Sequence, residues 1–189
     1  MSTKGHLFVI SGPSGVGKGT LVEKLLQRQK GIALSVSATT RPPRAGDRDG
    51  VTYHFLSDAQ FDMLIAADGF LEWAEVHGWR YGTLVSEVER ILASGQDLIL
   101  EIDIQGNDLI KKRLPDAVSI FIAPPSLSEL KQRLLQRGTE DEAAVARRLE
   151  TAKLELQAQN RYNVIIENDD LDAACAALAQ TVEAYRQGM

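Results

Sequence analysis

Short apolar runs alternate with amphipathic segments along most of the chain. Four of these runs predict strands, and they occupy residues 7–10, 98–100, 118–122 and 164–166. Runs of this length are typical of strands that are covered on both faces, as in a parallel sheet. Segments with helical spacing of apolar residues or with helical composition occupy residues 20–29, 127–134, 141–159 and 171–185. The alternation predicts βαβ units around a mostly parallel sheet.

The stretch from residue 38 to residue 85 interrupts this alternation. It begins with a turn-rich loop at residues 41–46, which contains two prolines and a glycine. The residues after the loop predict a strand at 51–56, a helix at 57–67 and a strand at 70–76. We therefore expect a small lobe that is inserted into the α/β core.

Composition narrows the class of protein. The chain has 189 residues, which favours one domain with room for an inserted lobe. Its 21 basic and 26 acidic residues give a net charge of −5, which argues against nonspecific nucleic-acid binding. Cys175 is the only cysteine, so an intrachain disulfide and a cysteine-built zinc site are excluded. The apolar stretches are far shorter than a membrane span. We expect a cytoplasmic protein, a monomer or small homo-oligomer, that binds neither nucleic acid nor a membrane.

A glycine-rich loop follows the first apolar run. Residues 12–18 match the pattern G-x-x-x-x-G-K, with a predicted strand before them and a predicted helix after them. The glycines allow backbone N–H groups to converge on phosphate oxygens, and the helix N-terminus adds partial positive charge. Lys18 can reach the β- and γ-phosphates of a nucleotide. We expect the phosphates of a nucleotide to be bound by Gly12, Pro13, Ser14, Gly15, Val16, Gly17, Lys18, Gly19 and Thr20.

The residue after Lys18 departs from the usual motif. Ser or Thr normally stands there and binds Mg²⁺, whereas this chain has Gly19 followed by Thr20, which resembles the loop of adenylate kinases. We therefore expect the Mg²⁺ of Mg-ATP to be held mainly by phosphates and water. Glu101 and Asp103 follow the second apolar run and point to one face of an extended segment. They are the expected water-mediated contacts of the ion.

Further ordered blocks extend over nearly the whole chain. They are residues 11–18, 35–46, 70–75, 81–83, 101–106, 121–126, 137–140 and 168–170. Together these blocks resemble the guanylate kinase family, which transfers a phosphoryl group from ATP to GMP in purine nucleotide metabolism and gives ADP and GDP. The resemblance also implies that dGMP is accepted.

The same resemblance implies an architecture. The expected fold is a single α/β domain, 1–189, with a P-loop NTPase-type parallel sheet flanked by helices, an inserted GMP-binding lobe and a small helical lid. The core would span about 1–37, 86–136 and 160–189, the lobe about 38–85 and the lid about 137–159.

The resemblance further implies which residues bind GMP. The phosphate would be held by Arg41, Arg44, Tyr53 and Tyr81, and the guanine by Ser37, Glu72, Thr83 and Asp103. Two arginines on a proline-stiffened loop can both form bidentate hydrogen bonds with one phosphate. A carboxylate at Glu72 can accept from guanine N1–H and N2–H, and a hydroxyl at Ser37 or Thr83, where the family often has Ser, can donate to O6. Adenine would present a lone pair to Glu72, and such mispairing discriminates by roughly 10⁴-fold.

Phosphoryl transfer requires that charge on the γ-phosphoryl group be dispersed. The resemblance implies that Lys18, Mg²⁺ and three lid arginines do this, and the arginines are Arg133, Arg137 and Arg148. It places ATP contacts at Arg133, Arg137 and Asn168, the last beside the adenine, and a GMP contact at Arg148. The residues expected to be catalytic are Lys18, Arg41, Arg137 and Arg148. No general base is required, because the acceptor is already a phosphate anion.

Two alternatives stay open at this point. One is a kinase of the same fold with another monophosphate as its acceptor, against which Glu72 and Asp103 argue. The other is a catalytically weak guanylate-kinase-like domain that binds a protein partner, against which the intact loop at 12–18 and the lid arginines argue. Turnover with a preferred acceptor other than GMP would favour the first, and peptide binding without turnover would favour the second.

Overall fold

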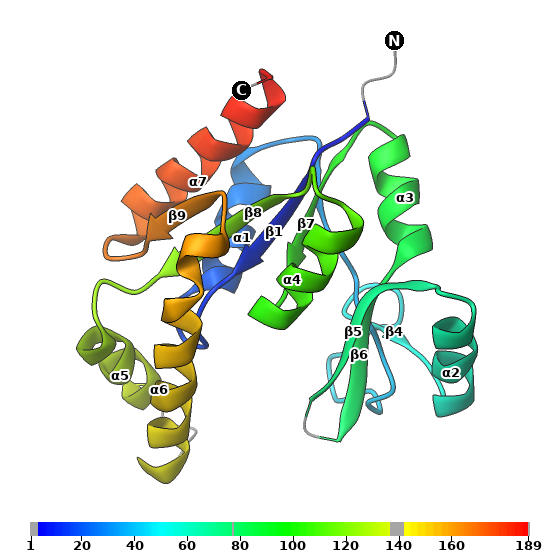
Figure 1. The fold of residues 1–189 in the computed structure, drawn as a ribbon, viewed down its shortest axis with the longest axis horizontal. Helices are drawn as coiled ribbons and strands as arrows, with labels where there is room; N and C mark the ends of the chain where they lie inside the picture. Colours follow the sequence, from blue (N-terminus) through cyan, green and yellow to red (C-terminus); the bar gives the residue numbers. More distant parts are fainter. Residues whose placement is uncertain (1–3, 77, 137–141, 189) are drawn as a thin grey trace.

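The centre of the protein is a five-stranded parallel sheet, seen in a computed structural model that describes residues 4–76, 78–136 and 142–188 (Figure 1). The strands lie in the order β2-β7-β1-β8-β9, and their bounds are Leu7–Ser11 (β1), Ile32–Leu34 (β2), Asp97–Glu101 (β7), Val118–Ala123 (β8) and Val164–Glu167 (β9). The four strands predicted from apolar runs are confirmed, and so is the parallel sheet. Strand β2 was not predicted, because it has only three residues at the sheet edge, two of them partly buried and one exposed.

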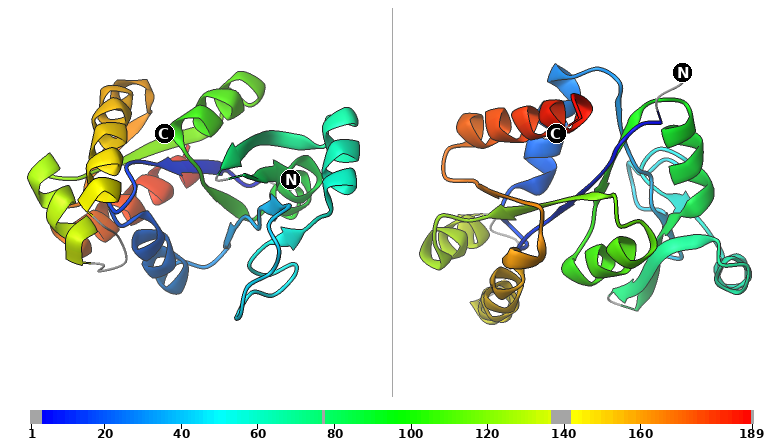
Figure 2. Two further views of the ribbon diagram at one scale, coloured as in Figure 1. Left: turned by 90° about the horizontal axis from the view of Figure 1, so that it is seen from below. Right: turned by 45° about the horizontal axis from the view of Figure 1, so that its top comes forward.

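Helices cover both faces of this sheet. The four that do so are α1 (Lys18–Arg28), α3 (Val85–Ala93), α4 (Ile104–Arg113) and α7 (Leu171–Arg186). Figure 2 shows α1 and α7 on the face of the sheet opposite α4. In β1, Phe8 and Ile10 belong to the apolar cluster that includes α1 and α7, whereas Leu7 and Val9 belong to that of α3 and α4. Burial on two faces explains why this strand is continuously apolar in sequence. Among the helices of the described residues, none is both long and apolar enough to span a membrane.

Helices α5 (Leu127–Gln136) and α6 (Glu142–Gln157) pack against each other at one end of the core (Figure 1). The hydroxyl of Ser126 accepts a hydrogen bond from the N–H of Glu129 at 3.1 Å and so caps the first turn of α5. Helix α6 confirms most of the long helix predicted at 141–159. The division of the chain into core, lobe and lid stays a prediction, and residues 137–141 lie outside the described residues.

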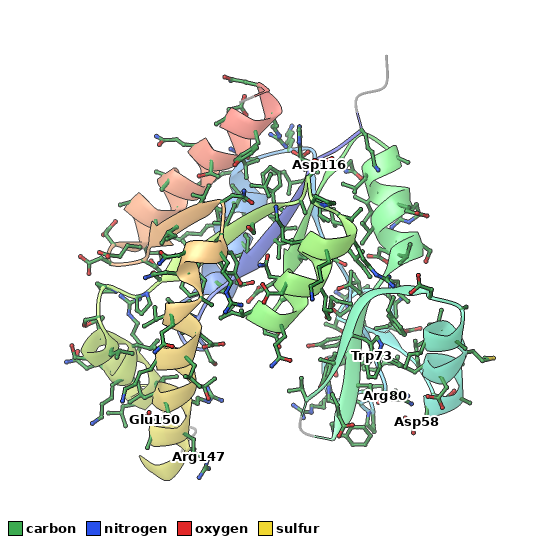
Figure 3. All side chains as sticks on the ribbon, in the orientation of Figure 1. Asp58, Trp73, Arg80, Asp116, Arg147 and Glu150 are labelled. Atoms are coloured by element: carbon green, nitrogen blue, oxygen red, sulfur yellow. The ribbon has the colours of Figure 1, made fainter. Side chains whose placement is uncertain are left out.

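The residues between β2 and α3 form a second sheet in the order β4-β3-β6-β5. Its elements are β3 (Ala38–Thr39), β4 (His54–Phe55), α2 (Asp58–Ala66), β5 (Phe70–Val76) and β6 (Trp79–Leu84). Helix α2 packs on this sheet through Phe61, whose ring stacks on Phe70 with a centroid distance of 4.3 Å. Arg80 of β6 forms ion pairs with Asp58 and Asp62 of α2, and Figure 3 shows Arg80 and Asp58 together at this end of the molecule. These contacts hold the helix against the sheet.

The second sheet differs from the prediction in three places. The two-residue strand β3 was not predicted, because it is too short to show a pattern. The strand predicted at 51–56 is shortened to β4, because the Thr52 hydroxyl accepts from the N–H of Arg48 at 2.7 Å and donates to its carbonyl at 2.9 Å, which closes a turn. Strand β6 was not predicted, since Gly82 and its polar neighbours give little apolar pattern. It nevertheless pairs with both β3 and β5.

Loops that follow four strands gather at one edge of the main sheet. Residues 12–17 follow β1, Asp103 closely follows β7, Pro124 follows β8 and Asn168 follows β9. In parallel α/β sheets, ligands bind outside the carboxyl ends of the strands. The second sheet lies on one side of this edge, and α5 and α6 lie on the other (Figure 1). A functional site is therefore expected at this edge of the main sheet.

Candidate functional site

The phosphate loop connects β1 to α1 and is shaped by its glycines. Gly12 has a φ of 147°, and a Cβ there would lie 2.2 Å from the carbonyl oxygen of Ile122, so only glycine fits. The ammonium of Lys18 folds over the loop and donates to the carbonyl oxygens of Gly12 at 2.6 Å and Pro13 at 3.2 Å. A phosphate in this loop would meet both that charge and the positive end of the α1 dipole.

A cavity of about 290 Å³ opens in front of the phosphate loop. It is lined by Ser14, Gly15, Gly17, Lys18, Gly19, Thr20 and Glu101. A Cβ at Gly19 would lie 3.8 Å from Glu101 Oε2, so the Glu101 carboxylate faces the loop at the position where the usual motif has a hydroxyl. Carboxylate and hydroxyl oxygens suit Mg²⁺. Within the described ranges no three His, Cys, Asp or Glu side chains cluster as a metal site.

Asn168 stabilises the phosphate loop from the end of β9. The residue is 4% exposed, and its side-chain Nδ2 donates to the carbonyl of Val16 at 2.7 Å. Its backbone N–H donates to the carbonyl of Ala123 at 2.8 Å. The side-chain amide predicted to contact adenine is thus bonded to the loop in this structure, and the adenine contact stays a prediction.

The predicted lid arginines differ in where they lie. Arg133 donates through Nη1 to the carbonyl of Asn168 at 2.9 Å and through Nε to Glu129 Oε1 at 3.3 Å. Arg148 of α6 extends to the phosphate loop, where its Nη1 donates to the hydroxyl of Ser14 at 3.4 Å. Arg137 lies outside the described residues. The structure therefore brings two of the three arginines to the loop or to the strand end beside it.

A second cavity, of about 320 Å³, lies between the main sheet and the second sheet. It is lined by Leu34, Ser35, Ser37, Thr52, Tyr53, Thr83, Leu100, Glu101 and Ile102. Ser37, Tyr53 and Thr83 are among the predicted GMP contacts. Glu101 lines this cavity and the one at the phosphate loop, so the two cavities adjoin. Two ligands bound in them would meet near Glu101.

Glu72 lies in a half-buried position beside two other predicted guanine contacts. The β5–β6 register places Glu72 opposite Thr83, whose hydroxyl donates to Glu72 Oε1 at 2.6 Å. Asp103 caps α4, and its Oδ1 accepts from the N–H of Gly106 at 2.7 Å. Burial raises the pKa of Glu72, the bond from Thr83 opposes this, and the charge of Asp103 raises the pKa further. The ionised carboxylate can accept hydrogen bonds from the N–H groups of a purine.

Arg41 is 7% exposed and is surrounded by hydrogen-bond acceptors and aromatic rings. Its Nη2 pairs with Asp47 at 2.8 Å, and its Nη1 donates to the carbonyl of Pro42 at 2.9 Å. The guanidinium carbon lies 5.2 Å from the centroid of the Tyr53 ring, and the Tyr53 and Tyr81 ring centroids are 5.9 Å apart. The structure thus groups three of the four residues predicted to hold the GMP phosphate.

Two acidic residues at the site were not predicted. Asp47 accepts from the N–H of Arg44 and from Arg41, each at 2.8 Å, and the bonds from Arg44 and then Arg41 lower the pKa of Asp47. The side chain of Arg44 is exposed. Burial raises the pKa of Glu155 in α6. The charge of Lys18 lowers this pKa and the charge of Asp103 raises it further, so the Glu155 carboxylate lies near both residues. Neither acid stands in a recognised motif, because each is one of several charged residues in a polar segment.

Comparison with known proteins decides the family. A family model described as guanylate kinase matches residues 4–185. The chain belongs to the guanylate kinase family. A guanylate kinase of Synechococcus sp. (strain CC9902) is 50% identical over 178 residues, which cover 94% of this chain and 95% of the relative. A guanylate kinase of Thermobifida fusca (strain YX) is 48% identical over 179 residues, which cover 95% of this chain and 91% of the relative.

A solved guanylate kinase also has a similar fold. The crystal structure of guanylate kinase from Anaplasma phagocytophilum matches with a TM-score of 0.73 and 30% sequence identity, covering 97% of this chain and 87% of that one. Membership of the guanylate kinase family confirms the resemblance, the fold class and the class of enzyme, a nucleoside monophosphate kinase. The roles of individual residues stay predictions.

Proposed function

We propose that this protein transfers the γ-phosphoryl group of ATP to GMP, giving ADP and GDP in purine nucleotide metabolism, and that dGMP is also an acceptor. The observation that supports this best is that Glu101 borders both cavities, one at the phosphate loop and one lined by the hydroxyl groups of Tyr53 and Thr83, the second of which donates to Glu72. Family membership and about 50% identity to curated guanylate kinases support the same reaction. We expect the protein to act in the cytoplasm without a nucleic-acid or membrane partner, as a monomer or small homo-oligomer.

On the ATP side, the phosphate loop and Lys18 bind the phosphates. The Lys18 ammonium donates to two loop carbonyls, and a phosphate bound in the loop would be a charged acceptor for the same group. Glu101 and Asp103 would contact Mg²⁺ through water, and the ion would neutralise charge on the β- and γ-phosphates. The Thr20 hydroxyl, which lines the same cavity as Glu101, would donate to a phosphate. Arg133, Arg137 and Asn168 complete the proposed ATP site.

On the GMP side, Glu72 accepts hydrogen bonds from guanine. Its Oε1 already accepts from Thr83, so Oε2 has more lone-pair capacity for N1–H or N2–H. The Thr83 proton is directed to Glu72, and this leaves Ser37 as the hydroxyl donor for O6. Asp103 lies near Glu72 and adds a second acceptor for the 2-amino group.

The GMP phosphate lies against Arg41, Arg44, Tyr53 and Tyr81 in this proposal. Arg41 has five N–H donors, and the bonds to Asp47 and Pro42 use only some of them. It can therefore bind a phosphate without releasing Asp47, which keeps the guanidinium oriented. The two tyrosine hydroxyls donate to further phosphate oxygens.

Phosphoryl transfer then needs positioning and charge dispersal rather than proton abstraction, since the attacking oxygen belongs to a phosphate anion. Lys18, Arg41, Arg137 and Arg148 supply the positive charge. The contact of Arg148 with Ser14 supports a position beside the transferred group, because Ser14 lines the ATP cavity.

A coupled assay of ADP release tests the proposal. ATP is supplied with one acceptor at a time, chosen from GMP, dGMP, AMP, UMP and dTMP. We expect the highest kcat/KM with GMP. A preference for AMP, UMP or dTMP refutes the proposed acceptor, and no turnover with any of the five refutes the proposed reaction.

A further inference from the structure

Gly106 lies at the point where the two acidic residues of the proposed guanine site meet. It is the third residue of α4 and is buried. A Cβ added to it would lie 3.3 Å from Glu72 Oε2 and 3.4 Å from Asp103 Oδ1. The same Cβ would lie 3.1 Å from Ile102 Cδ1. A side chain at residue 106 would therefore be in tight contact with the end of Ile102 and with both carboxylates.

The backbone at this position does not require glycine. Gly106 lies within an α-helix and is not among the glycines of the described residues that have a positive φ. Alanine is the better helix former in such a position. The hydrogen bond from the Gly106 N–H to Asp103 would be available to any residue except proline. Local conformation thus favours alanine, and the missing side chain needs another explanation.

The atoms that an added methyl group would meet supply that explanation. Glu72 Oε1 is held by Thr83, whereas Oε2 is the oxygen that faces Gly106. All three neighbours of the added Cβ are ends of side chains, which can shift by a few tenths of an ångström. An alanine would therefore leave the helix intact and displace the carboxylates of Glu72 and Asp103.

We propose that Gly106 determines specificity for guanine by leaving room for Glu72 and Asp103 to lie side by side. The inference rests on the proposed role of Glu72 in guanine recognition. Guanine presents N1–H and a 2-amino group with two further hydrogens, which two neighbouring carboxylates match. Hypoxanthine presents N1–H alone. Gly106 acts through the carboxylates, so it is a positioning residue.

The test compares Gly106→Ala with Gln105→Ala, an exposed change in the same turn of α4. The measurements are KM and kcat for GMP, IMP and ATP, and the melting temperature of the unliganded protein. For G106A we expect the KM for GMP to rise about tenfold or more, the loss expected for a weakened hydrogen bond to a charged group. The preference for GMP over IMP should fall, while the KM for ATP stays within twofold and the melting temperature does not fall. Q105A should match the wild type.

Several results would overturn the proposal. These are a KM for GMP within twofold of wild type, equal increases in the KM of GMP and ATP, or a G106A chain that does not fold, since only movable side-chain ends should stand in the way.

The proposed function is checked separately with Glu72→Gln. If E72Q leaves GMP binding unchanged, guanine recognition by Glu72 fails and the Gly106 proposal falls with it. If E72Q weakens GMP binding and G106A does not, only the Gly106 proposal fails. In the E72Q background, G106A should cost less than it does alone, and a full additional loss would contradict action through Glu72.

Discussion

Replacing Glu72 with glutamine separates the cost of burying a carboxylate from its use in binding. Burial and Asp103 raise the pKa of Glu72 above its unfolded value. Stability from such a group is fully present below the unfolded pKa and is lost as the pH rises through the folded pKa. At pH 7 the wild type therefore contains a destabilising charge that glutamine lacks, and Thr83 can still donate to the glutamine oxygen. We expect unliganded E72Q to melt at a higher temperature than wild type at pH 7, with a difference that shrinks toward acidic pH.

The same change should weaken GMP binding strongly. A carboxylate accepts from both guanine N1–H and N2–H, whereas the amide keeps one acceptor and turns a donor toward the other hydrogen. Losing a hydrogen bond to a charged group costs about 1.5–3 kcal/mol, and leaving a buried donor unpaired costs about 1–3 kcal/mol more. The sum, about 2.5–6 kcal/mol, corresponds to an affinity loss on the order of 10²–10⁴-fold. The KM for ATP should stay within about twofold, because Glu72 does not line the cavity at the phosphate loop.

Two measurements check this prediction. Calorimetric titration gives the GMP and ATP affinities of E72Q and wild type, and thermal melts of the unliganded proteins from pH 5 to pH 8 give the stability difference. Equal losses for GMP and ATP would mean that Glu72 does not recognise guanine. A lower melting temperature for E72Q at pH 7 would mean that the ionised carboxylate is stabilised by its surroundings, which contradicts the pKa argument.

Two further predictions concern the ATP side. Lys18→Ala should lower kcat by at least about 10²-fold without changing the fold, because the γ-phosphoryl group would lose the ammonium that folds over the phosphate loop. Circular dichroism controls for folding, and near-normal turnover would contradict the assigned role. Arg148→Ala should lower kcat by about tenfold or more, because a positive charge beside Ser14 is lost. Arg147 lies on an exposed part of α6 (Figure 3), and Arg147→Ala should keep kcat within twofold of wild type. Equal effects of the two changes in steady-state assays would show that α6 contributes only general positive charge.

The parts of the fold that could be predicted are those with a local signal. Strands buried on both faces are continuously apolar, so β1 and β8 are evident in sequence. Strand β6 depends on pairing with β3 and β5, and its own residues show no such run. The turn at Thr52 depends on a side-chain hydrogen bond to Arg48, which apolar patterning does not detect.

The candidate site also contains one part that the local sequence predicts and other parts that depend on how the chain folds. The phosphate loop is contiguous, and its glycines and Lys18 predict its chemistry directly. The bond between Thr83 and Glu72 depends on the register of β5 and β6, and the pairing of Asp47 with Arg41 depends on the path of a loop. The role of Gly106 appears only when the carboxylates around it are located in space.

The central claim is that one pocket accepts guanine while the adjoining loop supplies a phosphoryl group from ATP. Incubation of the protein with γ-labelled ATP and an equimolar mixture of GMP, AMP, UMP and dTMP, followed by separation of the labelled diphosphates, tests this most directly. The account predicts that the label is found in GDP. Label found chiefly in ADP, UDP or dTDP would contradict it.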